Sequence, residues 1–263
     1  MRLAARVEGV GLLGPGLAGW DAARDVLAGG AAFARTALAL PAPQALPATE
    51  RRRAGPAVKI ALAAGLAAAG AAGRDPASLA AVFASSSGDG ENCHAICEVL
   101  ASDDRQISPT RFHNSVHNAP AGYWSIATGA TASVDSVAAF DASFGAGLLE
   151  ALARIAADPA LPVVLVAYDA PYPEPLRAAR PVPDPFAVAL VLGAASEGRG
   201  PLLAASFTED PPDAMDDEGL ERLRREIPAA RALPLLARLA RGEAGAANLE
   251  YLPPLALRVE VTP

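Results

Sequence analysis

The feature that most restricts the fold is an unbroken apolar run, LPVVLVAY, from Leu161 to Tyr168. A strand with polar residues at alternate positions keeps one face in water, whereas a strand without them must be covered on both faces. Hydrophobic residues make up 52% of the 263 residues, which is enough apolar material to build such covering layers. The run therefore predicts a central strand buried between two layers.

Strand and helix patterns alternate along the rest of the chain. Strands are expected at residues 3–13, 79–85, 133–137, 161–168, 186–194, 202–207 and 255–261, and helices at 20–28, 56–73, 92–101, 111–128, 143–156 and 220–241, the last broken near Pro228 and Pro234. The Pro-rich residues 37–55 are expected to form a surface loop, and one interpretation of 186–207 is a hairpin turning at 196–200. This alternation predicts an α/β layered fold with a mostly parallel or mixed central sheet.

Charge and composition limit the partners and the cellular compartment. The net charge of −7 argues against a nucleic-acid partner, because phosphate binding requires a basic surface. We expect no membrane span, since no apolar run reaches the length of one, and no signal peptide at the N-terminus. Cys93 and Cys97 lie four residues apart, where a disulfide would be poorly placed on a helix face. Free thiols in a reducing cytoplasm are therefore expected.

The turn after the strand at 133–137 has the form of a nucleophile site without a conventional nucleophile. Strand-to-helix turns often present a reactive side chain beside a helix N-terminus, which stabilises an anion. This turn reads AAFDAS and contains no cysteine, while His94, His113 and His117 all precede it. Asp141 and Ser143 are expected to cap the following helix. An acyl hydrolase or transferase using Ser143 or Asp141 is an alternative, although the turn lacks the first glycine of a nucleophile elbow.

The residues before this turn allow three interpretations. His113 and His117, like Asn114 and Asn118, are four residues apart and would share the faces of one helix. They are expected to satisfy backbone groups near a subunit interface, with lining of an acyl tunnel and catalysis as alternatives. The segment Cys93-His94-x-x-Cys97, with His113 and His117, offers potential metal ligands, but we expect two small residues on a helix face and no metal.

The order of these pieces resembles the N-terminal half of a β-ketoacyl synthase, a member of the thiolase-like superfamily. The resemblance extends over residues 3–207 and depends on FHNS at 112–115, NAPAG at 118–122, FGAGLLEA at 144–151, LPVVLVA at 161–167, and 187–192 followed by Arg199-Gly200. It is closest to the short chain length factors of aryl polyene and related polyketide-like pathways, where a stretch of the form SxHNAPAG (115–122 here) recurs. The resemblance implies a thiolase-like fold with a ketosynthase-like unit at 1–207. Residues 208–263 would be a truncated C-terminal part, a helical segment and terminal strand packed on the same domain.

Departures from the family pattern are informative about activity. By the resemblance, Asp141, or Ala139 if a gap is allowed, occupies the position of the acyl-accepting cysteine. A synthase also uses two histidines after the nucleophile to stabilise the thioester oxyanion and the decarboxylating malonyl unit. No histidine follows His117 here. The resemblance therefore implies a subunit without condensing activity.

Such a subunit would pair with an active β-ketoacyl synthase and shape the tunnel that holds the growing acyl chain. The resemblance places much of the contact at residues 112–140, with Tyr123, Trp124, Phe140 and Phe144 as the aromatic residues available for an interface core. The residues expected in the tunnel or interface are Phe112, His113, Asn114, His117, Asn118, Tyr123, Trp124, Phe140, Ser143 and Phe144. Acyl carrier protein would bind mainly through the partner, and no cofactor is expected. A homodimeric binding scaffold is a further alternative.

Overall fold

The fold is built on one mixed β-sheet of nine strands in the computed structural model, which describes residues 3–196 and 199–263. The strand order is β4-β3-β5-β6-β1-β7-β9-β8, with β2 paired to β1. The strands are β1 (Leu3–Gly14), β2 (Leu17–Ala18), β3 (Ala80–Ala84), β4 (Val134–Val137), β5 (Val163–Asp169), β6 (Phe186–Ala194), β7 (Leu202–Thr208), β8 (Gly245–Glu250) and β9 (Ala256–Thr262). Strands β3, β4 and β5 are parallel, and the other pairs are antiparallel. The α/β layered prediction is confirmed.

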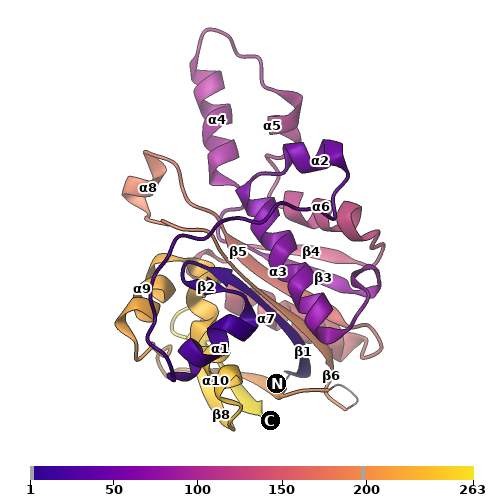
Figure 1. The fold of residues 1–263 in the computed structure, drawn as a ribbon, viewed down its shortest axis with the longest axis vertical. Coiled ribbons are helices and arrows are strands. Elements are labelled where there is room, and N and C mark those ends of the chain that lie inside the picture. Colours follow the sequence, from indigo (N-terminus) through magenta and orange to yellow (C-terminus); the bar gives the residue numbers. More distant parts are fainter. Residues whose placement is uncertain (1–2, 197–198) are drawn as a thin grey trace.

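Helices cover both faces of this sheet. They are α1 (Trp20–Ala28), α2 (Ala48–Arg53), α3 (Pro56–Ala72), α4 (Gly90–Ala101), α5 (Pro109–His113), α6 (Ala119–Thr128), α7 (Ser143–Ala157), α8 (Leu176–Ala179), α9 (Glu218–Glu226) and α10 (Leu233–Arg241). Short 3-10 helices occur at η1 (Pro76–Ser78), η2 (Phe140–Ala142) and η3 (Pro228–Ala232). In Figure 1, α4 and α5 project away from the layered body.

The central strand β5 has the two covered faces that its sequence predicts. Every residue of β5 is buried. Val163, Leu165 and Ala167 belong to the apolar core that contains α7. Val164 and Val166 belong to a second core, formed with α3 and α6 on the opposite face. Because successive side chains of a strand point to opposite faces of the sheet, this one apolar run contributes to both cores.

The C-terminal segment extends the same sheet. Strand β9 pairs antiparallel with β7 along seven residues of each strand, and β8 pairs with β9 at the sheet edge. To the core that contains α7, helix α10 contributes Leu233, Leu235 and Leu236, and η3 contributes Ala229, Ala230 and Ala232. Residues beyond Thr208 thus cover the side of α7 that faces away from β5.

Three expectations about the elements are wrong. Strands β6 and β7 do not form a hairpin, because β1 lies between them and pairs with both; part of the expected turn, 197–198, lies outside the described residues. The expected helix at 111–128 is interrupted at 114–118 between α5 and α6, just before Pro120 in the first turn of α6. The Pro-rich segment 37–55 is not entirely loop, because it contains the helix α2. In addition, the strand β8 was not predicted.

No helix among residues 3–196 and 199–263 has both the length and the apolar character to cross a membrane.

Close packing of α3 on β1 depends on glycine in the strand. A Cβ atom on Gly11 would lie 2.1 Å from the backbone oxygen of Ala64 in α3, and one on Gly9 would lie 2.3 Å from that of Ala68. Backbone atoms cannot rotate away as a side chain can, so a methyl group at either position would push the helix off the sheet.

We expect Gly11→Ala to lower the free energy of unfolding by about 1–3 kcal/mol or more, because of this overpacking. The matched control is Gly70→Ala in α3, where a Cβ atom would meet no atom within 4 Å. That substitution is expected to raise stability by up to about 1 kcal/mol through helix propensity. Urea denaturation followed by circular dichroism measures both, and equal stability of the two variants would contradict the packing argument.

Candidate site at the β4–α7 turn

The turn between β4 and α7 has a strained backbone. Phe140 has a φ of 53°, the only positive φ of a non-glycine residue among residues 3–196 and 199–263. Such a conformation is unusual for a bulky side chain. The Ser143 Oγ donates a hydrogen bond to the Phe140 carbonyl at 2.7 Å and accepts one from the Ala139 N–H at 3.1 Å. These two hydrogen bonds join Ser143 to the backbone of Ala139 and Phe140 and so stabilise the turn.

Neither polar side chain of the turn caps α7 as expected. The N-cap of α7 is Ala142, which makes no side-chain capping bond, and Ser143 is already the first helical residue. Ser143 is 1% exposed, and its hydroxyl is engaged in the two bonds that close the turn. The hydroxyl is therefore poorly placed to attack an acyl group, and this geometry gives the hydrolase alternative no support.

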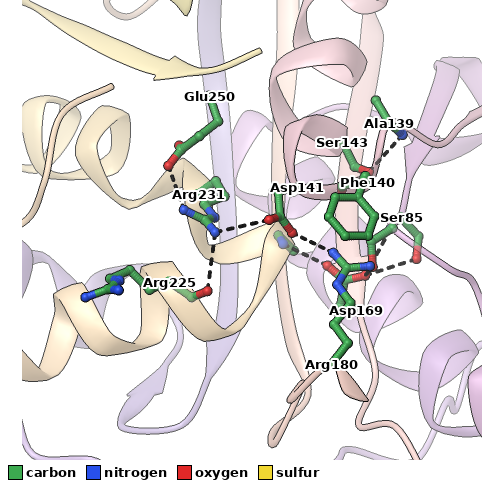
Figure 2. Close-up of polar contacts among 12 residues, drawn as sticks. Ser85, Ala139, Phe140, Asp141, Ser143, Asp169, Arg180, Arg225, Arg231 and Glu250 are labelled. Carbon is green, nitrogen blue, oxygen red and sulfur yellow. Dashed lines mark hydrogen bonds and ion pairs between the residues drawn. The ribbon is translucent and has the colours of Figure 1, made fainter. Parts of the chain in front are cut away.

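The Asp141 side chain is held by two arginines (Figure 2). Its Oδ1 accepts a hydrogen bond from Arg180 Nη2 at 2.5 Å, and its Oδ2 lies 3.4 Å from Arg231 Nη2. The Arg180 guanidinium also stacks on the Phe140 ring, with 3.6 Å between its Cζ and the ring centroid. Two ion pairs and a cation–π contact thus occupy the side chains at the tip of the turn.

The ion pairs continue from Asp141 into the C-terminal segment. Arg231 in η3 contacts Glu250 of β8 at 2.7 Å, and Glu250 also pairs with Arg224 of α9. Arg224 in turn binds both carboxylate oxygens of Glu221, at 2.7 and 2.8 Å. We call these six residues the ion ladder, Arg180-Asp141-Arg231-Glu250-Arg224-Glu221. It alternates in sign and balances three arginines with three carboxylates.

At one end of the ladder, the pairing of Glu221 with Arg224 shifts the pKa of both groups. The Arg224 hydrogen bonds hold the pKa of Glu221 below its usual range, although partial burial acts in the other direction. The Glu221 hydrogen bond raises the pKa of Arg224 above that of a free guanidinium, against the opposing effect of burial. Both shifts favour the charged forms, so the Glu221–Arg224 pair is ionised near neutral pH.

A buried carboxylate lies beside this ladder at the end of β5. Asp169 accepts hydrogen bonds from the Ser86 N–H at 3.0 Å, the Ser86 hydroxyl at 2.6 Å and the Ala229 N–H at 2.7 Å. Burial raises its pKa, and the hydrogen bonds from Ser86 and Ala229 oppose that rise. Asp169 therefore joins the loop after β3 to η3, a contact between distant parts of the chain that the sequence pattern gave no signal for.

Two of the four paired polar residues at 113–118, Asn114 and His117, contact backbone carbonyl groups, and they do not lie on one helix. The buried Asn114 donates a hydrogen bond to the Arg53 carbonyl at 2.9 Å and accepts one from the Tyr123 hydroxyl at 3.1 Å. The His117 Nε2 lies 3.1 Å from the Ser85 carbonyl. His113 and Asn118 are exposed. These contacts join α2, α5, α6 and the loop after β3.

The expectation that four aromatic residues are interface anchors is wrong for three of them. Tyr123, Trp124 and Phe144 are buried in the cores of the chain itself, so they cannot contact another subunit. Phe140 is 63% exposed, and Phe112 of α5 is 69% exposed. Exposed aromatic surface at this site therefore comes from the strained turn and from α5.

A cavity of about 510 Å³ lies between α4 and α8, within the usual size range of ligand sites. Its lining includes Cys93, His94 and Cys97 of α4 and Leu176 and Ala179 of α8. Both thiols are free, as expected, and both residues are exposed. Partial burial of the Cys93 sulfur, together with the neighbouring Cys97, raises the pKa of Cys93. No pattern in the sequence indicates this cavity, because the four residues of α8 show no clear helical periodicity.

Among the described residues, no group of three or more histidine, cysteine or acidic side chains could hold a metal ion.

Comparison with known proteins agrees with this geometry. The family model of the β-ketoacyl synthase N-terminal domain matches residues 25–247. The chain therefore belongs to the β-ketoacyl synthase family through that domain, and the ketosynthase-like prediction is confirmed. A search of the curated proteins found no matching sequence.

Solved structures that resemble the chain include three ketosynthase assemblies. One is the ketosynthase ApeO in complex with its chain length factor ApeC from Xenorhabdus doucetiae, in which one chain is 26% identical with a TM-score of 0.73, covering 98% of this chain and 99% of that one. The ishigamide ketosynthase/chain length factor is 13% identical, with a TM-score of 0.70 and coverage of 98% and 99%. The AntDE:AntF assembly is 13% identical, with a TM-score of 0.74 and coverage of 100% and 99%. The last two show the shared fold alone.

We expect Glu221→Gln to reduce stability in a pH-dependent way. Because the folded pKa of Glu221 is lowered, its ion pair contributes fully above the unfolded value of 4.5, and the contribution is lost as the pH falls through the lower folded pKa. At pH 7 the variant should lose about 1–3 kcal/mol of unfolding free energy, and the difference from the parent should shrink towards pH 3. Urea titrations at several pH values measure this difference.

Glu218→Gln is the control, since Glu218 is an exposed carboxylate in the first turn of the same helix. Its loss should cost less than about 1 kcal/mol. A Glu221→Gln effect that stays constant between pH 7 and pH 3 would contradict the ion-pair explanation.

Proposed function

We propose that this protein is a catalytically silent chain length factor. It pairs with an active β-ketoacyl synthase and helps to shape the tunnel for the growing acyl chain in aryl polyene or related polyketide or fatty acid biosynthesis. The observation that carries the proposal is the state of Asp141. It lies in the turn where the family resemblance places the nucleophile, and its carboxylate is bound by Arg180 and Arg231.

The chemistry of the turn supports a silent subunit. A carboxylate held by two arginines is a weak nucleophile, because the positive charges stabilise its anion. The buried Ser143 hydroxyl is occupied within the turn. His94, His113 and His117 precede the turn in the chain, and the His117 ring contacts the loop after β3 instead. None of these groups is arranged as a nucleophile with its base.

The free edge of β4 supports the pairing. Strand β4 ends the strand order, and the carbonyl groups of Ser133 and Val137 accept hydrogen bonds from Ala81 and Ser85 on the β3 side. Since backbone groups alternate in direction along a strand, the N–H and C=O groups of Val134 and Ser136 point away from β3. They are available to a strand of the synthase, so the proposed contact includes this edge together with Phe112 and Phe140.

The cavity between α4 and α8 supports a role in chain length. Its mainly small and apolar lining suits the distal end of an acyl chain, and each buried methylene contributes about 0.8 kcal/mol. Bulk added at the end of such a tunnel stops elongation earlier, because overpacking costs about 1–3 kcal/mol. We propose that Cys93 and Cys97 help to set this limit, beside the residues of 112–118 named from the sequence.

Charge supports the division of labour between the subunits. The net charge of −7 opposes docking of an acidic acyl carrier protein, so the basic docking surface belongs to the synthase in this proposal. The AntDE:AntF assembly contains a type II acyl carrier protein in complex with its ketosynthase. The free thiols fit a reducing cytoplasm, where we place the complex.

We also propose that residues 1–207 and 208–263 act as one domain. The pairing of β7 with β9 crosses the boundary between the two parts. Apolar residues of both parts share the core around α7.

The proposal is tested by co-expressing the chain with the ketosynthase of its source organism that most resembles ApeO. We expect a 1:1 complex on sizing chromatography that condenses malonyl units, whereas the isolated chain neither becomes acylated nor releases carbon dioxide from a malonyl thioester. Ser136→Pro removes only the outward N–H, so it should change stability by less than about 1 kcal/mol and weaken the complex at least tenfold. The proposal would be contradicted by a stable homodimer that does not bind the synthase, or by acylation of the isolated chain at Ser143 or Asp141.

Replacement of Cys97 by tryptophan should shorten the product. The indole ring would fill part of the cavity, and we expect the main product of the reconstituted complex to lose at least one two-carbon unit, as measured by mass spectrometry. Cys97→Ser, which preserves the volume, is the control and should leave the product distribution unchanged. A tryptophan variant that assembles normally and makes products of the original length would exclude this cavity as the end of the tunnel.

A further inference from the structure

The hairpin of β8 and β9 carries an exposed apolar surface. The interface proposed above does not include this surface. We call Phe207, Tyr251, Leu252 and Leu255 the hairpin patch. Leu252 is 59% exposed and Phe207 is 46% exposed, and the rings of Phe207 and Tyr251 lie 5.2 Å apart between centroids. Large apolar side chains gathered on the surface of an acidic protein commonly mark a contact with another protein.

The ion ladder places this patch beside the strained turn. Asp141 adjoins Phe140 in the chain, Glu250 adjoins Tyr251, and Arg231 bridges the two carboxylates (Figure 2). A second contact agrees, since a Cβ atom on Gly145 in the first turn of α7 would lie 2.6 Å from the Glu250 carbonyl oxygen and 3.9 Å from the Tyr251 ring. Phe140 and the hairpin patch therefore flank the same end of α7.

We propose that Phe140 and the hairpin patch form one docking surface for the ketosynthase subunit, with the ion ladder as the brace that holds its two parts together. This inference rests on the proposed function and adds residues 207 and 251–255 to the interface. Phe140 follows the free edge of β4 by three residues, so the surface continues directly from the proposed strand contact. Arg180, stacked on Phe140, supplies the combination of aromatic ring and guanidinium that is enriched at the centre of interfaces.

The same observations favour a synthase over other occupants. The patch is apolar, so it offers no charge to an acidic carrier protein. The similarity to a chain of the ApeO–ApeC complex covers 98% of this chain, so it includes the hairpin as well as the ketosynthase-like core. A second copy of the chain would need the surface to be complementary to itself, and it would leave the β4 edge contact with the synthase incomplete.

The test uses isothermal titration calorimetry to measure the dissociation constants of the Leu252→Glu and Leu252→Met variants with the same ketosynthase. We expect Leu252→Glu to raise the dissociation constant at least tenfold and Leu252→Met to change it less than threefold. The unfolding midpoint of the isolated chain should be unchanged in both variants, since Leu252 is largely exposed. A double-mutant cycle tests whether the surface is continuous. The double variant Phe140→Ala/Leu252→Ala should raise the dissociation constant by a factor that differs from the product of the factors for the two single variants.

Two results would overturn the inference. If Leu252→Glu binds the synthase as tightly as the parent while Ser136→Pro binds more weakly, the proposed function stands and the docking surface fails. If the isolated chain forms a dimer that Leu252→Glu dissociates, with synthase affinity unchanged, the patch serves a second copy. Failure of the unmodified chain to bind the synthase at all is a different outcome, which refutes the proposed function itself.

Discussion

Burial of α7 on two sides is the constraint on which the rest of the structure depends. One side packs on β3 and β5, and Phe144, Leu148 and Leu152 are fully buried. The other side requires a cover as well, since an exposed apolar helix face in the middle of the molecule would cost several kcal/mol. In this chain η3 supplies most of that cover, and the Glu250 carbonyl of β8 lies against Gly145 at the start of the helix. This explains why the residues after Thr208 continue the sheet instead of forming a detached tail.

The cover is fixed in position by charge as well as by apolar packing. Apolar contacts are non-directional, so they do not by themselves set the position of the C-terminal segment along α7. The ion ladder is directional, because guanidinium groups bind carboxylates in a planar fork. Asp141 and Glu250 on either side of Arg231 define one register between the turn and β8. The half-buried position of these groups makes the loss of any one partner costly, since another charge would remain unpaired.

In the proposed function, a turn shaped to present a side chain persists without a nucleophile. The positive φ of Phe140 is still enforced by the two Ser143 hydrogen bonds. What the turn now displays is an aromatic ring with an arginine on it, beside a carboxylate that belongs to a structural network. The proposed function and the proposed docking surface both depend on this arrangement, in which the turn exposes an aromatic ring and its carboxylate is bound by two arginines.

The sequence by itself determined the layered fold, because strand and helix patterns alternate around the apolar run at 161–168. It also located the turn at Asp141 within a recognisable family order. It also showed that the usual nucleophile and the later histidines are missing. Only the tertiary structure decided the partners of Asp141, since Arg180 and Arg231 lie 39 and 90 residues away and no local period relates them. The tertiary structure also decided the burial of Tyr123, Trp124 and Phe144 and the insertion of β1 between β6 and β7. It likewise decided that Phe140 and the hairpin patch flank the same end of α7. Each depends on which surfaces meet when the layers close, and local sequence does not encode that.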